Sequence, residues 1–214
     1  MKNIAKYIDH TCLKSDTTEN EIKNLCVEAI TYGFASVCVN PIYIPLAVKN
    51  LKNKDPKVCS VIGFPLGSIS TEMKFAEAML AIHQGVDELD MVINIGNLKQ
   101  GNFKEISDEV SKIVTASANI VIKVIIETCL LNDKEIVKIS KLIKNSGAEF
   151  VKTSTGFSHG GATVEDIRLI RKNVGNNFGV KASGGISSLL DVNNMINAGA
   201  NRIGTSSGVK ILNE

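Results

Sequence analysis

The stretches Phe150-Val151-Lys152-Thr153-Ser154-Thr155-Gly156 and Gly179-Val180-Lys181-Ala182-Ser183-Gly184-Gly185 share one pattern: a short β-rich run carries a lysine and then enters a glycine-bearing turn. Short runs rich in β-branched residues and bounded by turn residues are typical of buried strands. Comparable runs recur along the chain at residues 7–10, 35–39, 58–63, 88–93, 120–126, 150–154, 179–183 and 202–205. The sequence therefore predicts eight strands.

Helical patterns fill the intervals between these runs. Two apolar stripes have the spacing of one helix face, namely Ile22, Leu25, Cys26, Ala29 and Ile30, and Ile106, Val110, Ile113 and Val114. Helix starts are marked by residue pairs with the spacing of a capping box, which are Thr18 with Glu21, Thr163 with Asp166 and, as a weaker signal, Asn132 with Glu135. Strand and helix are therefore predicted to alternate throughout.

This alternation favours a particular α/β fold. No Pro/Gly/Ser-rich linker or low-complexity tract divides the chain, so we expect a single domain over residues 1–214. Eight strands with intervening helices predict a closed (β/α)8 barrel of the TIM type. An open doubly wound sheet is the alternative, but its dinucleotide-binding forms need a glycine-rich turn after the first strand, and residues 9–13 contain no glycine.

Composition excludes several classes of function. The 24 basic and 22 acidic residues nearly balance, which argues against nucleic acid or an anionic membrane as a partner. No apolar run is long enough to span a membrane, and residues 1–6 lack the apolar core of a signal peptide, so we expect a cytoplasmic protein. The five cysteines and three histidines show no metal-binding spacing. We therefore expect reduced thiols, no metal and no cofactor.

Charged residues fall on strand faces that should point into the barrel. Because side chains alternate along a strand, Lys152 and Lys181 should each point inward, as should Asp90 on the fourth strand. Lys123 and Glu127 share one face of the fifth predicted strand. Burial and a neighbouring cation each lower the pKa of a lysine, which yields a free amine able to attack carbonyl groups. The alternative is a buried ion network that only shapes the barrel mouth.

Two glycine-bearing turns follow the last two strands, Ser183-Gly184-Gly185-Ile186 and Gly204-Thr205-Ser206-Ser207-Gly208. In many (β/α)8 barrels these two loops bind a phosphate group through backbone N–H groups. Gly156, in the turn after the sixth strand, is a third place where the backbone could bind the phosphate. The sequence therefore predicts a phosphate site beside the two lysines.

Motifs spread over residues 8–208 resemble those of the deoxyribose-phosphate aldolases, a class I aldolase family. In chain order they lie at residues 8–11 (IDHT), 37–41 (VCVNP), 61–67 (VIGFPLG), 88–94 (ELDMVIN), 123–128 (KVIIET), 151–157 (VKTSTGF), 180–186 (VKASGGI) and 202–207 (RIGTSS). The resemblance implies a metal-free lyase that reversibly cleaves 2-deoxy-D-ribose 5-phosphate to D-glyceraldehyde 3-phosphate and acetaldehyde.

The resemblance also assigns roles to individual residues. Lys152 matches the lysine that forms the Schiff base, and Lys181 matches the second lysine, whose positive charge keeps the first amine uncharged. Asp90 matches the carboxylate that relays protons through water. The phosphate-binding positions of the family fall on Gly156, Gly184, Gly185, Ser206 and Ser207, and we expect Cys38 and Lys123 to line the pocket.

One position departs from some relatives. Where they carry a phosphate-binding lysine after the Thr-Gly pair, this chain has Phe157, so phosphate affinity should rest on backbone groups and hydroxyls. The expected partners are a small sugar phosphate and further copies of the chain, as a dimer or tetramer. The rival hypotheses are another Schiff-base sugar-phosphate aldolase, such as a transaldolase-like enzyme with a ketone donor, and a non-catalytic barrel that binds phosphate ligands.

Overall fold

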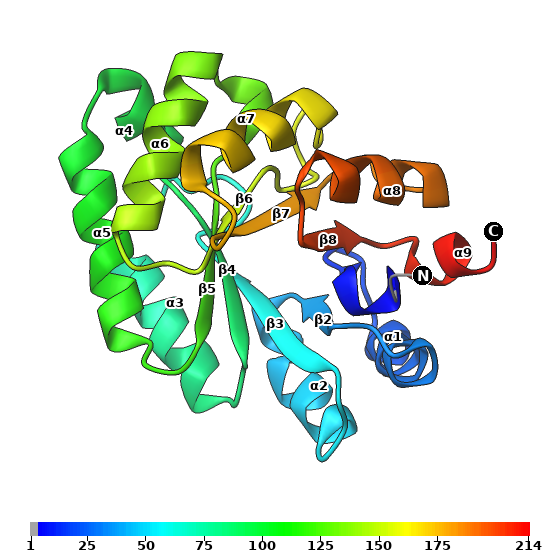
Figure 1. The fold of residues 1–214 in the computed structure, drawn as a ribbon. Helices are drawn as coiled ribbons and strands as arrows, with labels where there is room; N and C mark the ends of the chain where they lie inside the picture. The colour runs from blue at the N-terminus through cyan, green and yellow to red at the C-terminus, as the bar shows by residue number, and fades with distance from the viewer. Residues whose placement is uncertain (1–3) are drawn as a thin grey trace.

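A computed structural model describes residues 4–214 and shows a closed barrel of parallel strands (Figure 1). Each strand pairs with the next, and β1 pairs with β8 through Asp9 opposite Gly204, which closes the sheet and excludes the open alternative. The strands are β1 (Ile8–Cys12), β2 (Ser36–Val39), β3 (Lys57–Ile62), β4 (Glu88–Val92), β5 (Val121–Ile125), β6 (Phe150–Lys152), β7 (Gly179–Ser183) and β8 (Arg202–Thr205). The predicted barrel and all eight predicted runs are confirmed.

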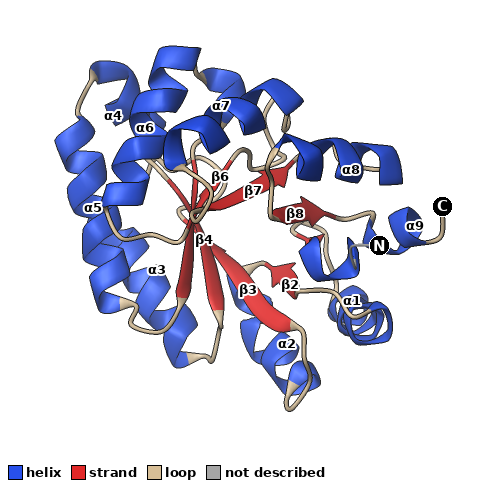
Figure 2. Cartoon of the chain, in the orientation of Figure 1, coloured by secondary structure: helices blue, strands red, loops and turns tan. Residues whose placement is uncertain are grey.

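Helices form a layer around the outside of the barrel (Figure 2). They are α1 (Glu19–Tyr32), α2 (Ile44–Leu51), α3 (Thr71–His83), α4 (Ile95–Gln100), α5 (Phe103–Ala116), α6 (Asp133–Asn145), α7 (Val164–Val174), α8 (Leu189–Ala198) and α9 (Gly208–Leu212). They are accompanied by the 3-10 turns η1 (Ile4–Tyr7), η2 (Pro41–Tyr43) and η3 (Thr128–Leu130). Within the described residues, no helix is long and apolar enough to cross a membrane.

The helix starts test the predicted capping boxes. The box of Thr18 and Glu21 at α1 is complete. Asn132 and Glu135, which we expected to be the weaker pair, also form a complete box at α6. At α7 the side chain of Thr163 accepts a hydrogen bond from the backbone N–H of Asp166, which is one half of the predicted box. Each bond satisfies a helix-end N–H that has no partner within the helix.

The main apolar core lies between the barrel and the helices. Residues on the outer faces of the strands, such as Val37, Met91, Val124 and Val151, are fully buried there. Inside the barrel the apolar contribution is smaller, a cluster of Leu13, Cys38, Cys59 and Val61 against which Phe64 packs. Alternate residues of one strand therefore face either the helix layer or the barrel interior. The interior, which has fewer apolar residues, is available for polar groups.

Candidate active site

Three lysines converge on one carboxylate inside the barrel. Asp90 on β4 is completely buried. Its Oδ2 accepts hydrogen bonds from Lys152 Nζ at 2.8 Å and from Lys181 Nζ at 2.7 Å. Its Oδ1 accepts one from Lys123 Nζ at 2.9 Å. The barrel register brings these residues together, because Lys152 pairs with Lys181 and Asp90 pairs with Lys123.

A second group of charges lies beside Asp90. Asp9 Oδ2 is 2.5 Å from Lys181 Nζ, and Asp9 Oδ1 is 2.7 Å from Arg202 Nη1. Glu88 Oε2 is 2.5 Å from Lys123 Nζ and 3.0 Å from Arg202 Nη1. We call Asp9, Glu88, Asp90, Lys123, Lys152, Lys181 and Arg202 the ion network.

Sequence reasoning gave no role to Asp9, Glu88 or Arg202. A signal existed, because the alternation rule that selected Asp90 also turns Asp9 on the first strand inward. Partners on strands far apart in sequence, such as β1 with β8, become visible only when the barrel closes.

Positive charges outnumber negative ones in the ion network. Three carboxylates meet four cationic side chains when every lysine is protonated. Within residues 4–214, Lys123, Lys181 and Arg202 each contact at least two carboxylates, whereas Lys152 contacts only that of Asp90. Lys152 is also the one member of the network that lines the pocket at the carboxyl ends of the strands. Of the four cations it is therefore the one with the fewest carboxylate partners and the one that lines the pocket.

The surroundings of Lys181 and Asp90 shift both pKa values. Burial alone lowers the pKa of Lys181, but the carboxylates of Asp9 and Asp90 outweigh it and raise that pKa above the usual 10.5. Burial alone raises the pKa of Asp90, but Lys123, Lys152 and Lys181 together hold it well below the usual 3.8. The general expectation that burial lowers the pKa of a strand-end lysine does not hold at Lys181, and the raised pKa agrees with the cationic role that the resemblance implies for this residue. Its ammonium is stabilised because two carboxylates, rather than cations alone, surround it.

Glu127 does not belong to the ion network. The strand β5 ends at Ile125, and Glu127 adopts a left-handed backbone conformation with φ of 53°, so it lies outside the strand on whose inward face we predicted it. Its carboxylate instead accepts hydrogen bonds from the backbone N–H of Thr155, at 3.2 Å, and from the Thr155 hydroxyl. Glu127 therefore holds the turn that follows β6, immediately beyond Lys152.

A pocket of about 720 Å³ opens at the carboxyl ends of the strands. Besides Lys152, its lining includes all the predicted phosphate positions, which are Gly156, Gly184, Gly185, Ser206 and Ser207. Gly156 and Gly185 have φ of 84° and 76°, and a Cβ atom at either position would meet no atom within 4 Å. The backbone there needs glycine for its conformation and leaves open space in front of it.

An aromatic pair borders the same pocket on another side. Phe157, which lines the pocket, is 54 % exposed. Its ring contacts that of Phe64 edge to face, with centroids 5.3 Å apart. Phe64 in turn packs against the apolar cluster inside the barrel. The pocket therefore has a polar wall at the turns after β7 and β8 and an apolar wall at Phe157, which packs against Phe64.

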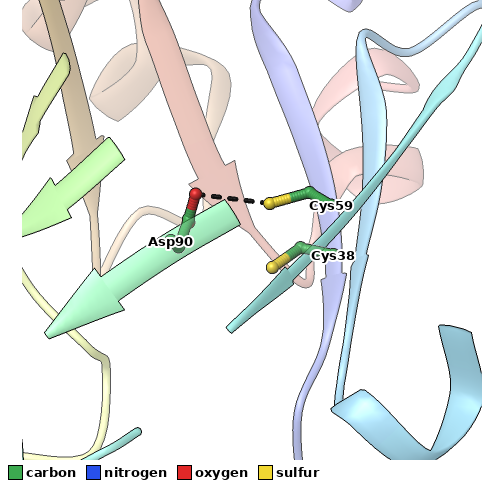
Figure 3. Close-up of side chains that lie close together, drawn as sticks. All are labelled: Cys38, Cys59 and Asp90. Carbon is green, nitrogen blue, oxygen red and sulfur yellow. Dashed lines mark hydrogen bonds between the residues drawn. The ribbon is translucent and has the colours of Figure 1, made fainter. Parts of the chain in front are cut away.

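Cys38 and Lys123 are not among the residues that line this pocket, where we expected them. Both are fully buried. Cys38 faces Cys59 in register on neighbouring strands, and Cys59 Sγ lies 3.3 Å from Asp90 Oδ1 (Figure 3). Lys123 lies behind Asp90, with its Nζ 3.4 Å from Cys59 Sγ. Lys123 donates to Asp90 directly, whereas Cys38 lies beside Cys59, which donates to Asp90.

Cys38, Cys59 and Asp90 are close enough to be considered as metal ligands, since their ligand atoms lie within 4.8 Å of one another. The surroundings oppose that use. Burial raises the pKa of Cys59 well above 9.0, whereas a metal needs the thiolate. Asp90 already binds three ammonium groups, which would repel a divalent ion. The three residues therefore do not fit a metal centre, and the chemistry available here is that of amines and a carboxylate.

Comparison with known proteins agrees with this geometry. Residues 3–214 match the family described as DeoC/LacD family aldolase. The chain is 55 % identical to the deoxyribose-phosphate aldolase of Caldanaerobacter subterraneus subsp. tengcongensis, with 100 % of this chain and 94 % of that protein covered. It is 56 % identical to the deoxyribose-phosphate aldolase of Clostridium botulinum strain Kyoto, with 98 % and 99 % covered.

Solved structures show the same similarity in three dimensions. The tetrameric deoxyribose phosphate aldolase of Aeropyrum pernix superposes with a TM-score of 0.92 at 37 % identity, over 98 % of this chain and 89 % of that one. An aldolase named QR15 gives 0.95 at 42 % identity, over 100 % and 96 %.

Proposed function

The chain belongs to the DeoC/LacD family of aldolases, and from that premise we propose that it reversibly cleaves 2-deoxy-D-ribose 5-phosphate to D-glyceraldehyde 3-phosphate and acetaldehyde. The observation that carries this proposal is the position of Lys152. It is the one lysine of the ion network that lines the pocket, and it lies in the same pocket as the five glycine and serine residues suited to phosphate. A nucleophilic amine and a phosphate site within one pocket fit a short sugar phosphate.

The reaction follows from an amine at this position. Lys152 Nζ, once deprotonated, attacks the C1 aldehyde of the open-chain sugar, and loss of water from the carbinolamine leaves a protonated imine. The imine accepts the electron pair of the C2–C3 bond as that bond breaks, and the C3 hydroxyl gives up its proton to form the aldehyde of the three-carbon product. Protonation of the resulting enamine at C2 and hydrolysis release acetaldehyde and restore the amine.

Asp90 and Lys181 supply the proton handling in this scheme. Both lysines donate to the same Asp90 oxygen, Oδ2, so a proton can be redistributed between the amines through one carboxylate. Because the pKa of Lys181 is raised, this residue remains the cation of the pair. Asp90 stays ionised because its pKa is lowered, so it passes protons on, through water in the pocket, rather than storing one.

The phosphate end is formed by the turns after β6, β7 and β8. Gly156, Gly184 and Gly185 leave backbone N–H groups accessible, and Ser206 and Ser207 add hydroxyls, so an anion can be bound without a dedicated lysine. Phe157, which follows Gly156, contributes no charge, so the anion would be held by backbone groups and hydroxyls.

Reductive trapping tests substrate and nucleophile together. Incubation with acetaldehyde and sodium borohydride should add one ethyl group to the peptide that contains Lys152 and leave the Lys181 peptide unmodified. Lys152→Arg, which keeps the charge but cannot form the imine, is the matched control and should stay unlabelled. Labelling by dihydroxyacetone but not by acetaldehyde would favour the ketone-donor aldolases instead.

Assembly and location are part of the same proposal. A relative from Aeropyrum pernix is described as tetrameric, and we propose that this chain also forms a homo-oligomer, a dimer or tetramer. Light scattering coupled to size-exclusion chromatography measures this directly, and a monomer at micromolar concentration would refute it. The five free cysteines, three of them buried, suit a reducing cytoplasm.

A further inference from the structure

His10 is a buried histidine that the ion network does not use. It follows Asp9 on β1, so its side chain points to the opposite face of the strand, away from the barrel interior. Only 3 % of the residue is exposed, yet it lines the pocket together with Ser206 and Ser207. A polar residue in this position requires an explanation other than packing.

Helix α1 holds one edge of the imidazole. The Nε2 atom of His10 lies 2.6 Å from Glu28 Oε2, which belongs to α1. The ring also contacts Phe34, with centroids 4.8 Å apart and an angle of 45° between the planes. Glu28 is 43 % exposed at its side chain, so it can be replaced without opening the core. The ring is therefore fixed between a carboxylate and an aromatic face.

The other edge of the imidazole faces the turn after β8. Nδ1 is buried and has no hydrogen-bonding partner within residues 4–214. A Cβ atom at Gly208 would lie 3.0 Å from Nδ1 and 2.9 Å from Phe34 Cζ, so the backbone of Gly208 rests directly on both rings. Gly208 follows Ser207 and begins α9.

His10 is also tied to the beginning of the same turn. It pairs in register with Thr205 across the β1–β8 seam. The Thr205 hydroxyl accepts a hydrogen bond from the backbone N–H of Ser207 at 2.9 Å and donates one to the carbonyl of Ile186 at 2.7 Å. His10 therefore supports both ends of the segment Thr205–Gly208, and this segment contains the two serines of the pocket.

We propose that His10, held by Glu28, is a positioning residue for the phosphate-binding turn and that it sets the preference for phosphorylated over unphosphorylated sugar. This inference rests on the proposed function. Two hydroxyls and their backbone bind an anion well only when their geometry is fixed in advance. The imidazole supplies a rigid support under Gly208, and the bond to Glu28 fixes its orientation.

The test separates phosphate binding from chemistry. In Glu28→Leu, which removes the acceptor, kcat/KM for 2-deoxyribose 5-phosphate should fall about 10-fold through KM, and inhibition by inorganic phosphate should weaken by a similar factor. The kcat/KM for unphosphorylated 2-deoxyribose should fall by no more than about 2-fold. Glu28→Gln keeps an acceptor for the Nε2 proton and should restore most of the loss.

A second variant perturbs the same contact from the opposite side. Gly208→Ala places a methyl group against His10 and Phe34 and should produce the same difference between the two substrates. His83→Gln, at the exposed end of α3, is the control for a histidine outside the pocket. Equal losses with both substrates, or none with either, would overturn the inference. If wild-type protein cleaves neither substrate, the proposed function itself fails.

Discussion

Lys152 and Arg202 belong to the same ion network but differ in their carboxylate partners and in their access to the pocket. Arg202 binds Asp9 and Glu88, and nothing of it reaches the pocket. Lys152 has Asp90 alone and lines the pocket. A cation with several carboxylate partners holds structure, whereas an amine with one shared partner beside an open pocket is placed to react with a carbonyl group. Number of partners and access, rather than burial alone, distinguish the reacting end from the supporting end.

The largest expected effect is at the reacting end. Lys152→Arg keeps a cation beside Asp90 but cannot form an imine, so kcat should fall by at least about 10⁴-fold because covalent catalysis is lost. Calorimetric titration with inorganic phosphate measures binding separately from turnover. The affinity of the variant for phosphate should stay within about 3-fold of the wild-type value. Retention of turnover would reject the Schiff base.

Lys181→Met should have the next largest effect, on activity and stability together. Removing this ammonium leaves Asp9 and Asp90 short of a partner, which is expected to cost about 3–5 kcal/mol of unfolding free energy. Borohydride trapping at Lys152 should slow by about 10²-fold, because the cation of the pair is gone. Unchanged trapping would show that Lys181 has only a structural role.

Arg202→Met should affect the supporting end alone. It breaks the contacts with Asp9 and Glu88 and should lower the unfolding free energy by about 3 kcal/mol, as measured by urea denaturation. At a temperature where the variant is folded, trapping at Lys152 should stay within about 5-fold of wild type. A loss of trapping as large as that of Lys181→Met would erase the distinction between the two ends.

The smallest expected effect is on how the unfolding free energy depends on pH. Lys181 has a raised pKa, so its contribution is complete below 10.5 and is lost as pH rises through the higher folded value. Asp90 has a lowered pKa, so its contribution is present above 3.8 and is lost as pH falls through the lower folded value. The difference in unfolding free energy between wild type and Lys181→Met should therefore be constant between pH 3.8 and pH 10.5 and should shrink above pH 10.5. A difference that shrinks between pH 6 and 9 would contradict this assignment.

Particular residues show how far sequence reasoning reached. The inward positions of Lys152, Lys181 and Asp90 followed from period-two alternation, which depends only on local backbone geometry. The same rule failed for Glu127, because β5 ends two residues earlier and the backbone then turns left-handed. We also expected Cys38 and Lys123 to line the pocket, and they do not. Alternation along a strand tells which residues face the barrel interior, but it does not tell how far each one lies from the barrel mouth.

The sequence by itself determined the order of strands and helices, the glycine-bearing turns and the family, because each depends on residues that are close together along the chain. Only the closed barrel decided that Asp9 and Asp90 share the ammonium of Lys181, and that Arg202 and Glu88 complete the network. These contacts join residues at least 91 positions apart in the chain. The direction of the Lys181 pKa shift depends on them, because opposing effects of burial and carboxylates must be weighed at actual distances.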